Sequence, residues 1–153
     1  LKCNKQSLTD KAKAMAEELK SLKKELEEIK KAAMGGEAES LIAKAAEVNG
    51  VKLIAEEFSG YSVDDLRNLS DDIKAAAKNT CMVFAAANGG KVTFLVSLTD
   101  DLVEKGFHAG KMIKEIAAAA GGGGGGKANM AQAGAKDSSK IKDAFAVAEK
   151  LLS

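Results

Sequence analysis

Six consecutive glycines, residues 121–126, constrain this chain more than any other feature of its sequence. Glycine loses more backbone entropy on folding than any other residue, so a glycine run costs stability unless its missing side chains are used. The run is therefore either a flexible linker or a place where a backbone comes very close to another group. Only 27 residues follow Gly126, too few for an independent core. We interpret the run as a loop inside one domain, and expect it to be among the most mobile segments of the free protein.

The first third of the chain predicts a long helix. Apolar residues recur at alternating spacings of four and three over residues 8–33, which is the a/d pattern of a helix that packs along one seam. Gly35-Gly36 predicts the end of this helix, and a second, shorter helix is expected over residues 37–48. Two helices around a Gly-Gly turn favour an αα-hairpin over residues 1–49. The same seam would also join two copies of the chain, so a homodimer is the alternative.

Residues 50–153 predict a small globular domain in which helices flank a mixed β-sheet, so the fold class is α/β. The expected elements are a strand at 51–55, a helix opened by Ser62 and Asp65, a strand at 81–87, a hairpin at Asn88-Gly89-Gly90, a strand at 92–98, a helix from Thr99-Asp100 to about Ala120, a strand at 129–133 and a helix opened by Asp137-Ser138. In the helix that ends near Ala120, we expect Gly106 and Gly110 to lie on or beside the inward face and to let another backbone pack closely.

Composition indicates a globular protein and excludes several classes of function. The chain is 46% hydrophobic and 29% charged, which is typical of folded domains. Cys3 and Cys81 have no spaced partners, which argues against a disulfide framework or a zinc site. No segment is apolar enough to span a membrane, so we expect a soluble, cytoplasmic protein. The chain begins with Leu1 in place of a methionine, which suggests a fragment of a longer protein.

Catalytic residues are not apparent. The single histidine, His108, is expected on the polar, solvated side of its helix, and one histidine cannot build a metal site. A serine or cysteine nucleophile would lack a base unless His108 served. Pairs of neighbouring aspartates fall where helix first turns or helix surfaces are expected, and there they favour the helix dipole or water. We therefore predict no catalytic residue and no metal ligand in this chain.

The glycine run comes close to two phosphate-binding motifs without fitting either. Gly121, Gly126 and Lys127 have the spacing of a P-loop, but Ala128 stands where Ser or Thr must ligate magnesium. The dinucleotide-binding pattern is met trivially by any six glycines, and both motifs require a strand before the run. The sequence predicts a helix there instead.

Positive charge gathers around the glycine run. Residues 102–142 contain seven lysines against three acidic residues, a net charge of +4, whereas the whole chain has a net charge of +1. Glycine N–H groups can approach phosphate or ribose oxygens closely because no Cβ intervenes. A lysine-rich solvated surface would have the same composition, but its coincidence with the glycine run favours a nucleic acid as the partner.

The residues on both sides of the run resemble a known family. The segments Lys105-Gly106-Phe107-His108-Ala109-Gly110 and Asn129-Met130-Ala131-Gln132-Ala133-Gly134, with the glycines between them, closely resemble the C-terminal domain of alanyl-tRNA synthetases. This domain belongs to the DHHA1 group, which is shared with DHH-type phosphoesterases. Lys127 fills a basic position that is usually Arg, whereas Ala128 and Ala135 depart from the usual Pro and second Gly. In the phosphoesterase branch a His typically follows the glycines, so Lys127 favours the synthetase branch.

The resemblance implies a parent enzyme that charges tRNA with alanine, using ATP, and clears mischarged serine or glycine in a separate editing domain. The class II catalytic core and the zinc-binding cluster of the editing domain lie outside this chain. We therefore expect no cofactor here, with ATP, magnesium and zinc bound elsewhere in the parent. The resemblance also implies that this domain binds the elbow of tRNA(Ala), where the D- and T-loops meet, and in some members contributes to dimerisation.

The sequence thus predicts a non-catalytic tRNA-binding module whose partners are tRNA(Ala) and the catalytic and editing domains of the parent chain. A second copy in a homodimer is the alternative partner for the N-terminal seam. The residues expected at the interface with tRNA are Gly121, Gly122, Gly123, Gly124, Gly125, Gly126, Lys127, Gln132, His108, Lys111, Lys114 and Lys136. The alternative is a domain that clamps short oligonucleotides or cyclic dinucleotides in a DHH-type phosphoesterase. A purely structural dimerisation domain is a third option.

Overall fold

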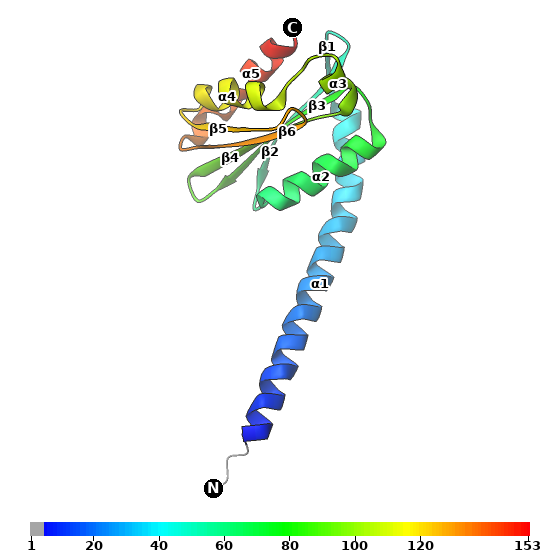
Figure 1. Cartoon of the computed structure of the whole chain (residues 1–153), viewed down its shortest axis with the longest axis vertical. Coiled ribbons are helices and arrows are strands. Elements are labelled where there is room, and N and C mark those ends of the chain that lie inside the picture. The colour runs from blue at the N-terminus through cyan, green and yellow to red at the C-terminus, as the bar shows by residue number, and fades with distance from the viewer. Residues whose placement is uncertain (1–4) are drawn as a thin grey trace. The chain divides into compact units, whose positions relative to one another are not determined.

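The computed structural model describes residues 5–153, except for the side chains of residues 5–8, 30, 31 and 33–35. Cys3 therefore lies outside the described residues. The chain divides into two compact units, Leu1–Glu37 and Ala38–Ser153. Its elements, in chain order, are α1 (Lys5–Lys44), β1 (Ala46–Val48), β2 (Val51–Ser59), α2 (Val63–Ala76), β3 (Thr80–Asn88), β4 (Lys91–Leu98), α3 (Asp100–Glu104), α4 (Ala109–Ala119), β5 (Gly123–Gly126), β6 (Met130–Ala135), the 3-10 helix η1 (Ser138–Lys140) and α5 (Ile141–Leu152) (Figure 1).

The N-terminal part of the chain is one helix, and the predicted αα-hairpin is wrong. Gly35-Gly36 lies inside α1 instead of ending it. Each glycine costs a helix about 1 kcal/mol relative to alanine, and the strong helix formers on both sides offset that cost. The second half of the predicted hairpin also ends early, because residues 46–48 form a strand. Asn49 and Gly50 both have positive φ, 52° and 79°, as in the two-residue turns that join paired strands.

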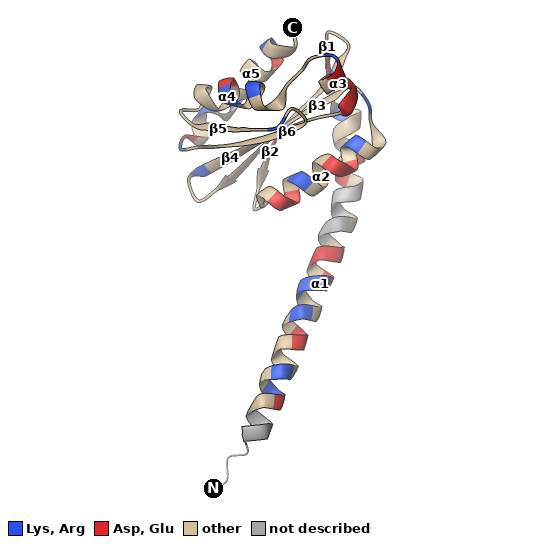
Figure 2. Ribbon diagram, in the orientation of Figure 1, with Lys and Arg blue, Asp and Glu red and all other residues tan. Residues whose placement is uncertain are grey.

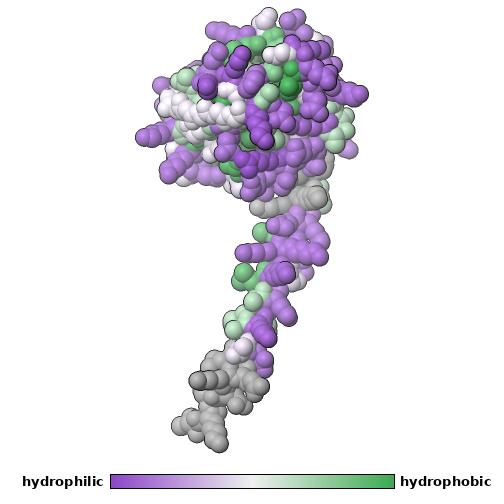
Figure 3. Space-filling view, viewed as in Figure 1, coloured by the Kyte–Doolittle hydropathy of each residue, from purple (hydrophilic) through white to green (hydrophobic). Residues whose placement is uncertain are grey.

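One side of α1 is apolar and exposed within the first unit. The large side chains of the predicted seam are between 55% and 71% exposed, and they are Met15, Leu19, Leu22, Leu26 and Ile29 (green along α1 in Figure 3). Exposed apolar stripes of this size are typical of helices that pack against another chain or domain. The homodimer stays a prediction.

The second unit is built on a six-stranded mixed sheet in the order β1-β2-β3-β4-β6-β5. Among the described strands only β2 and β3 pair in parallel, and the connection between them contains α2. Helices α4 and α5 pack on one face of the sheet and α2 packs on the other (Figure 1). The predicted α/β class, a mixed sheet flanked by helices, is confirmed.

The central strand β3 is covered on both faces. Cys81, Met82, Val83 and Phe84 are completely buried, which explains why this strand is a continuous apolar run rather than an alternating one. Burial raises the pKa of the Cys81 thiol to about 12, so the thiol stays neutral at physiological pH. Cys81 is therefore a packing residue and not a nucleophile.

Two helix starts match the predicted caps. Ser62 and Asp65 form a reciprocal capping box at the start of α2, with Ser62 N donating to Asp65 Oδ2 at 2.9 Å. Asp137 accepts a hydrogen bond from Ser139 N at 3.0 Å, ahead of η1 and α5. The side-chain hydrogen bond from Ser139 also lowers the pKa of Asp137, so this cap stays ionised.

The predicted helix from Thr99 to Ala120 is two helices, α3 and α4. Gly106 has φ of 99°, a conformation that other residues rarely adopt, and it ends the first helix. Gly106 is exposed, so its expected inward position is wrong. Gly110 does allow close packing, because a Cβ built on it would lie 2.6 Å from the carbonyl oxygen of Gly126 in β5.

The glycine run is an edge strand and not a loop. Gly123–Gly126 form β5, which pairs antiparallel with β6 from Gly123 opposite Gly134 to Gly126 opposite Ala131. A Cβ on Gly122, Gly124 or Gly126 would overlap the backbone of β6. A Cβ on Gly123 would meet nothing within 4 Å, and one on Gly125 would meet only Lys114 Cε at 4.0 Å. Packing against β6 therefore requires glycine at positions 122, 124 and 126 but not at 123 and 125.

This alternation predicts opposite effects for neighbouring substitutions. Gly124→Ala forces a Cβ into β6 and is expected to lower the free energy of unfolding by about 1–3 kcal/mol. Gly123→Ala adds a Cβ in open space, and its free energy of unfolding is expected to stay within about 0.5 kcal/mol of that of the unsubstituted chain. Urea unfolding followed by fluorescence of Tyr61, the one tyrosine, measures both. Equal destabilisation by the two variants would contradict this packing of β5.

Two fully buried serines provide a second matched pair. Ser70 Oγ donates to the carbonyl of Arg67 at 2.8 Å, whereas Ser97 Oγ has no hydrogen-bond partner among the described residues. Because an unsatisfied buried hydroxyl costs free energy, Ser97→Ala is expected to raise the free energy of unfolding by about 1 kcal/mol. Ser70→Ala is expected to lower it by a similar amount. A loss of stability in Ser97→Ala would show that the hydroxyl has a partner in solution.

Candidate nucleic-acid interface

A groove of about 470 Å³ lies between α2 and the ribbon formed by β5 and β6. This volume falls within the usual range for small-molecule sites. The groove is lined by Arg67, Asp71, Lys74, Leu95, Gly125, Gly126, Lys127, Asn129, Met130, Ala131 and Gln132. It thus combines three cations and one acid with glycine backbone that is half-buried at Gly125 and exposed at Gly126.

The buried side of α2 fixes the residues that this helix presents to the groove. Leu66, Leu69 and Ile73 are completely buried against the sheet. Residues spaced by three or four positions share a helix face, so Asp71 lies between Arg67 and Lys74 along α2. Acidic and basic positions alternate along this helix (red and blue in Figure 2). The groove wall therefore carries both signs of charge.

A hydrogen bond between Arg67 and Gln132 joins α2 to β6 across the groove. The guanidinium donates from Nη2 to Gln132 Oε1 at 2.7 Å and from Nη1 to Asp64 Oδ1 at 3.1 Å. The Arg67 side chain is 44% exposed, so these contacts add little to stability. Their effect is to hold a planar cation in one orientation at the groove.

The turn after β5 is held in place by the start of α4. The carbonyls of Lys127 and Ala128 accept hydrogen bonds from Gly110 N and Ala109 N at 3.1 and 2.8 Å. The Lys127 N–H donates to the Met130 carbonyl at 2.9 Å and closes the turn. The first amides of α4 are therefore occupied by the chain itself, and the turn sets the position of Lys127 at the groove.

The structure brings only part of the predicted interface together. Gly125, Gly126, Lys127 and Gln132 line the groove. The other expected glycines do not line it: Gly123 and Gly124 form the first half of β5, and Gly121 and Gly122 precede that strand.

The remaining predicted lysines lie elsewhere. Lys111 and Lys114 are exposed on α4, the helix that packs on the face of the sheet opposite α2. Lys136 follows β6 at the end away from Lys127. These three lysines surround the glycine ribbon without lining the groove.

The sequence predicted that His108 lies on a solvated helix surface, and this prediction is wrong. It occupies the N-cap position of α4 with φ of −138° and is half-buried. Its ring lies beside Gly110, and its Nδ1 atom is buried with no hydrogen-bond partner among the described residues. The break after Gly106 explains the difference, because it moves His108 from the middle of a predicted helix to the start of a new one.

Sequence reasoning missed Arg67, Asp71, Lys74 and Asn129. Arg67 is the only arginine of the chain, and this was the one feature of the sequence that could have marked any of these residues as a candidate for the interface. The three α2 residues lie outside the basic region at 102–142, and 65 positions separate Arg67 from Gln132. Only the fold brings α2 next to the glycine ribbon.

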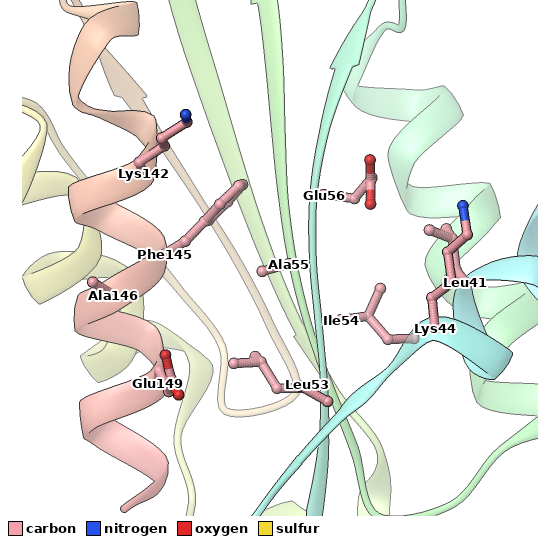
Figure 4. A pocket seen from close by; sticks show the side chains of 11 residues that line it. Leu41, Lys44, Leu53, Ile54, Ala55, Glu56, Lys142, Phe145, Ala146 and Glu149 are labelled. Atoms are coloured by element: carbon pink, nitrogen blue, oxygen red, sulfur yellow. The ribbon is translucent and has the colours of Figure 1, made fainter.

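A second groove, of about 390 Å³, lies between α5 and β2 (Figure 4). Phe145 of α5 points toward β2 across this groove (Figure 4). Its charged residues balance as two lysines and two glutamates, namely Lys44, Lys142, Glu56 and Glu149. Because it offers no excess positive charge and no glycine backbone, it suits a polyanion less well than the groove beside β6.

No three or more His, Cys, Asp or Glu residues in the described part gather closely enough to hold a metal ion. None of the helices in that part has the length and apolarity needed to cross a membrane.

Comparison with known proteins gives a consistent result. The family model described as the DHHA1 domain matches residues 50–153. An alanine–tRNA ligase of Geobacillus kaustophilus is 41% identical over 149 residues, which are 97% of this chain and 17% of that protein. The corresponding ligase of Clostridioides difficile is 38% identical over 152 residues, which are 99% of this chain and 17% of that protein. The chain thus spans about a sixth of the length of these relatives.

Solved structures share the fold. The C-Ala domain from Aquifex aeolicus alanyl-tRNA synthetase is 28% identical with a TM-score of 0.67, and the match covers 71% of this chain and 96% of that one. A DHH-domain protein described as a member of the s1p family of ribosomal proteins has a TM-score of 0.53 at 17% identity, over 87% of this chain and 32% of that one. The resemblance to the C-terminal domain of alanyl-tRNA synthetases is confirmed, and the chain belongs to the DHHA1 domain family.

Proposed function

We propose that this chain is a non-catalytic tRNA-binding domain of an alanine–tRNA ligase. Its relatives are alanine–tRNA ligases, and one neighbour in fold is the C-Ala domain of such an enzyme. In this role the domain binds the elbow of tRNA(Ala) and presents the same tRNA to aminoacylation and editing domains of a parent chain. ATP, magnesium and zinc would act in those other domains, in the cytoplasm.

The observation that carries the proposal is bare backbone beside clustered cations. Gly125 is half-buried, and a Cβ there would meet only Lys114 Cε at 4.0 Å, so packing does not require glycine at this position. Lys127 directly follows the strand, and Lys74 and Arg67 face it across the groove. Close approach of a sugar–phosphate backbone explains both the missing side chain and the positive charge.

The chemistry of the groove suits RNA shape rather than a catalytic reaction. Lysine ammonium groups and backbone N–H groups bind phosphate oxygens without activating them. The buried Cys81 is unreactive, and no nucleophile with a neighbouring base lines the groove. A folded RNA corner, which presents phosphates and riboses at fixed spacing, is the partner that such a surface recognises.

Charge reversal at Lys127 tests this function. Lys127→Glu is expected to weaken binding of a tRNA(Ala) transcript about tenfold or more at low salt, because each neutralised phosphate contributes to counterion release. The slope of log K against log salt is expected to become shallower by about 0.7–0.9 for each phosphate that the variant no longer neutralises. Filter binding at several salt concentrations measures both quantities.

The control for that titration is Lys136→Glu, which makes the same charge change at the far end of β6, outside the groove. It is expected to weaken binding less than Lys127→Glu. Two results would contradict the proposed function. One is an unchanged affinity of the folded Lys127→Glu variant for tRNA, and the other is no measurable binding of tRNA by the unsubstituted 153-residue chain.

A further inference from the structure

We propose that the groove between α2 and β6 holds one unstacked guanine nucleotide of the bound RNA, and that Asp71 reads the base. This inference rests on the proposed function and names the part of the RNA that enters the groove. It starts from the observation that the groove contains a carboxylate, which a site for phosphate alone would not need.

Most polar groups in the groove are hydrogen-bond donors. Arg67, Lys74 and Lys127 are cations without acceptor atoms. Gln132 already accepts from Arg67 through Oε1, so its amide N–H groups are what it offers to a ligand. The ligand must therefore be rich in acceptors, as phosphate groups and base carbonyls are.

Asp71 carries the one carboxylate among the residues that line the groove, where Asn129 is the other side chain with a free acceptor oxygen. The Asp71 side chain has no hydrogen-bond or ion-pair partner in the described part of the chain, although it lies on the same helix face as Arg67 and Lys74. Asp71 is exposed in the free chain, and a carboxylate repels a nearby phosphate. Its presence in the groove is favourable only when the ligand also brings donors.

Guanine brings the matching set of groups. Its N1–H and N2 amino groups are adjacent donors that one carboxylate accepts together, while O6 and N7 are acceptors for Arg, Lys or amide N–H groups. Adenine and cytosine offer one amino group each, and uracil offers one imino group. Only guanine supplies a pair of adjacent donors to Asp71 and acceptors to the surrounding cations.

The remaining walls fit the rest of a nucleotide. Met130, which is half-buried, provides apolar surface for one face of a base, and Gly125 with Lys127 provides backbone and charge for a phosphate. A groove of about 470 Å³ has room for one nucleotide rather than a helix. Proteins read base edges in RNA mainly where a base is unpaired or unstacked, so the bound residue lies in a loop.

The test compares four nucleotides on the 153-residue chain. Calorimetric titration with GMP, AMP, CMP and UMP is expected to show the tightest binding for GMP, with amide NMR shifts at Gly125, Gly126 and Lys127. Asp71→Asn is expected to weaken GMP binding about tenfold and AMP binding less than about twofold, because a good bidentate base contact carries a discrimination of this order. Asp72→Asn, the neighbouring acid outside the groove, is the control and is expected to change neither.

The outcomes separate this inference from the proposed function. If the chain binds the tRNA(Ala) transcript but binds GMP, AMP, CMP and UMP with equal affinity, the guanine site is overturned and the proposed function stands. A preference for GMP that survives in Asp71→Asn would overturn the role of Asp71. Failure of the unsubstituted chain to bind tRNA would overturn the proposed function itself, regardless of the affinities measured for the four nucleotides.

Discussion

Strand β5 lies between β6 and α4 only because it has no side chains on the side that faces them. A Cβ at Gly124 would overlap β6, and a Cβ at Gly110 would press on the carbonyl of Gly126. Strands in most sheets stand clear of a covering helix by the length of their side chains. Here two backbones approach directly, and the entropy lost by ordering the glycines is offset by tight packing of α4 on the sheet edge.

This close approach determines where the polar groups of the groove lie. Since α4 sits against β5, its first amides reach the carbonyls of Lys127 and Ala128 and hold the turn there. The turn starts β6, and β6 carries Gln132 to the guanidinium of Arg67 on the opposite face of the sheet from α4. Packing on one face thus determines the position of the groove on the other. A paired edge strand, rather than an irregular loop, carries the glycine backbone at this edge of the sheet.

Sequence reasoning succeeded where the signal is local. The capping box at Ser62, the buried run at Cys81 and the turn at Asn88-Gly89-Gly90 each depend on a few neighbouring residues, and all three occur as predicted. It failed where the outcome depends on residues far away. Gly35-Gly36 has the local composition of a helix end, yet the flanking residues carry the helix through it. The resemblance to a family identified the domain, but it placed neither Arg67 nor Asp71 in the groove.

The glycine run shows why an unusual sequence is hard to interpret by itself. Six identical residues carry no periodicity, so the sequence does not show the alternation between positions where a Cβ would overlap β6 and positions where a Cβ has room. In the structure this alternation has the two-residue period of any strand. Glycine at 122, 124 and 126 is explained by the fold alone. Glycine at 123 and 125 is not explained by packing, because a Cβ there would meet nothing closer than Lys114 Cε at 4.0 Å.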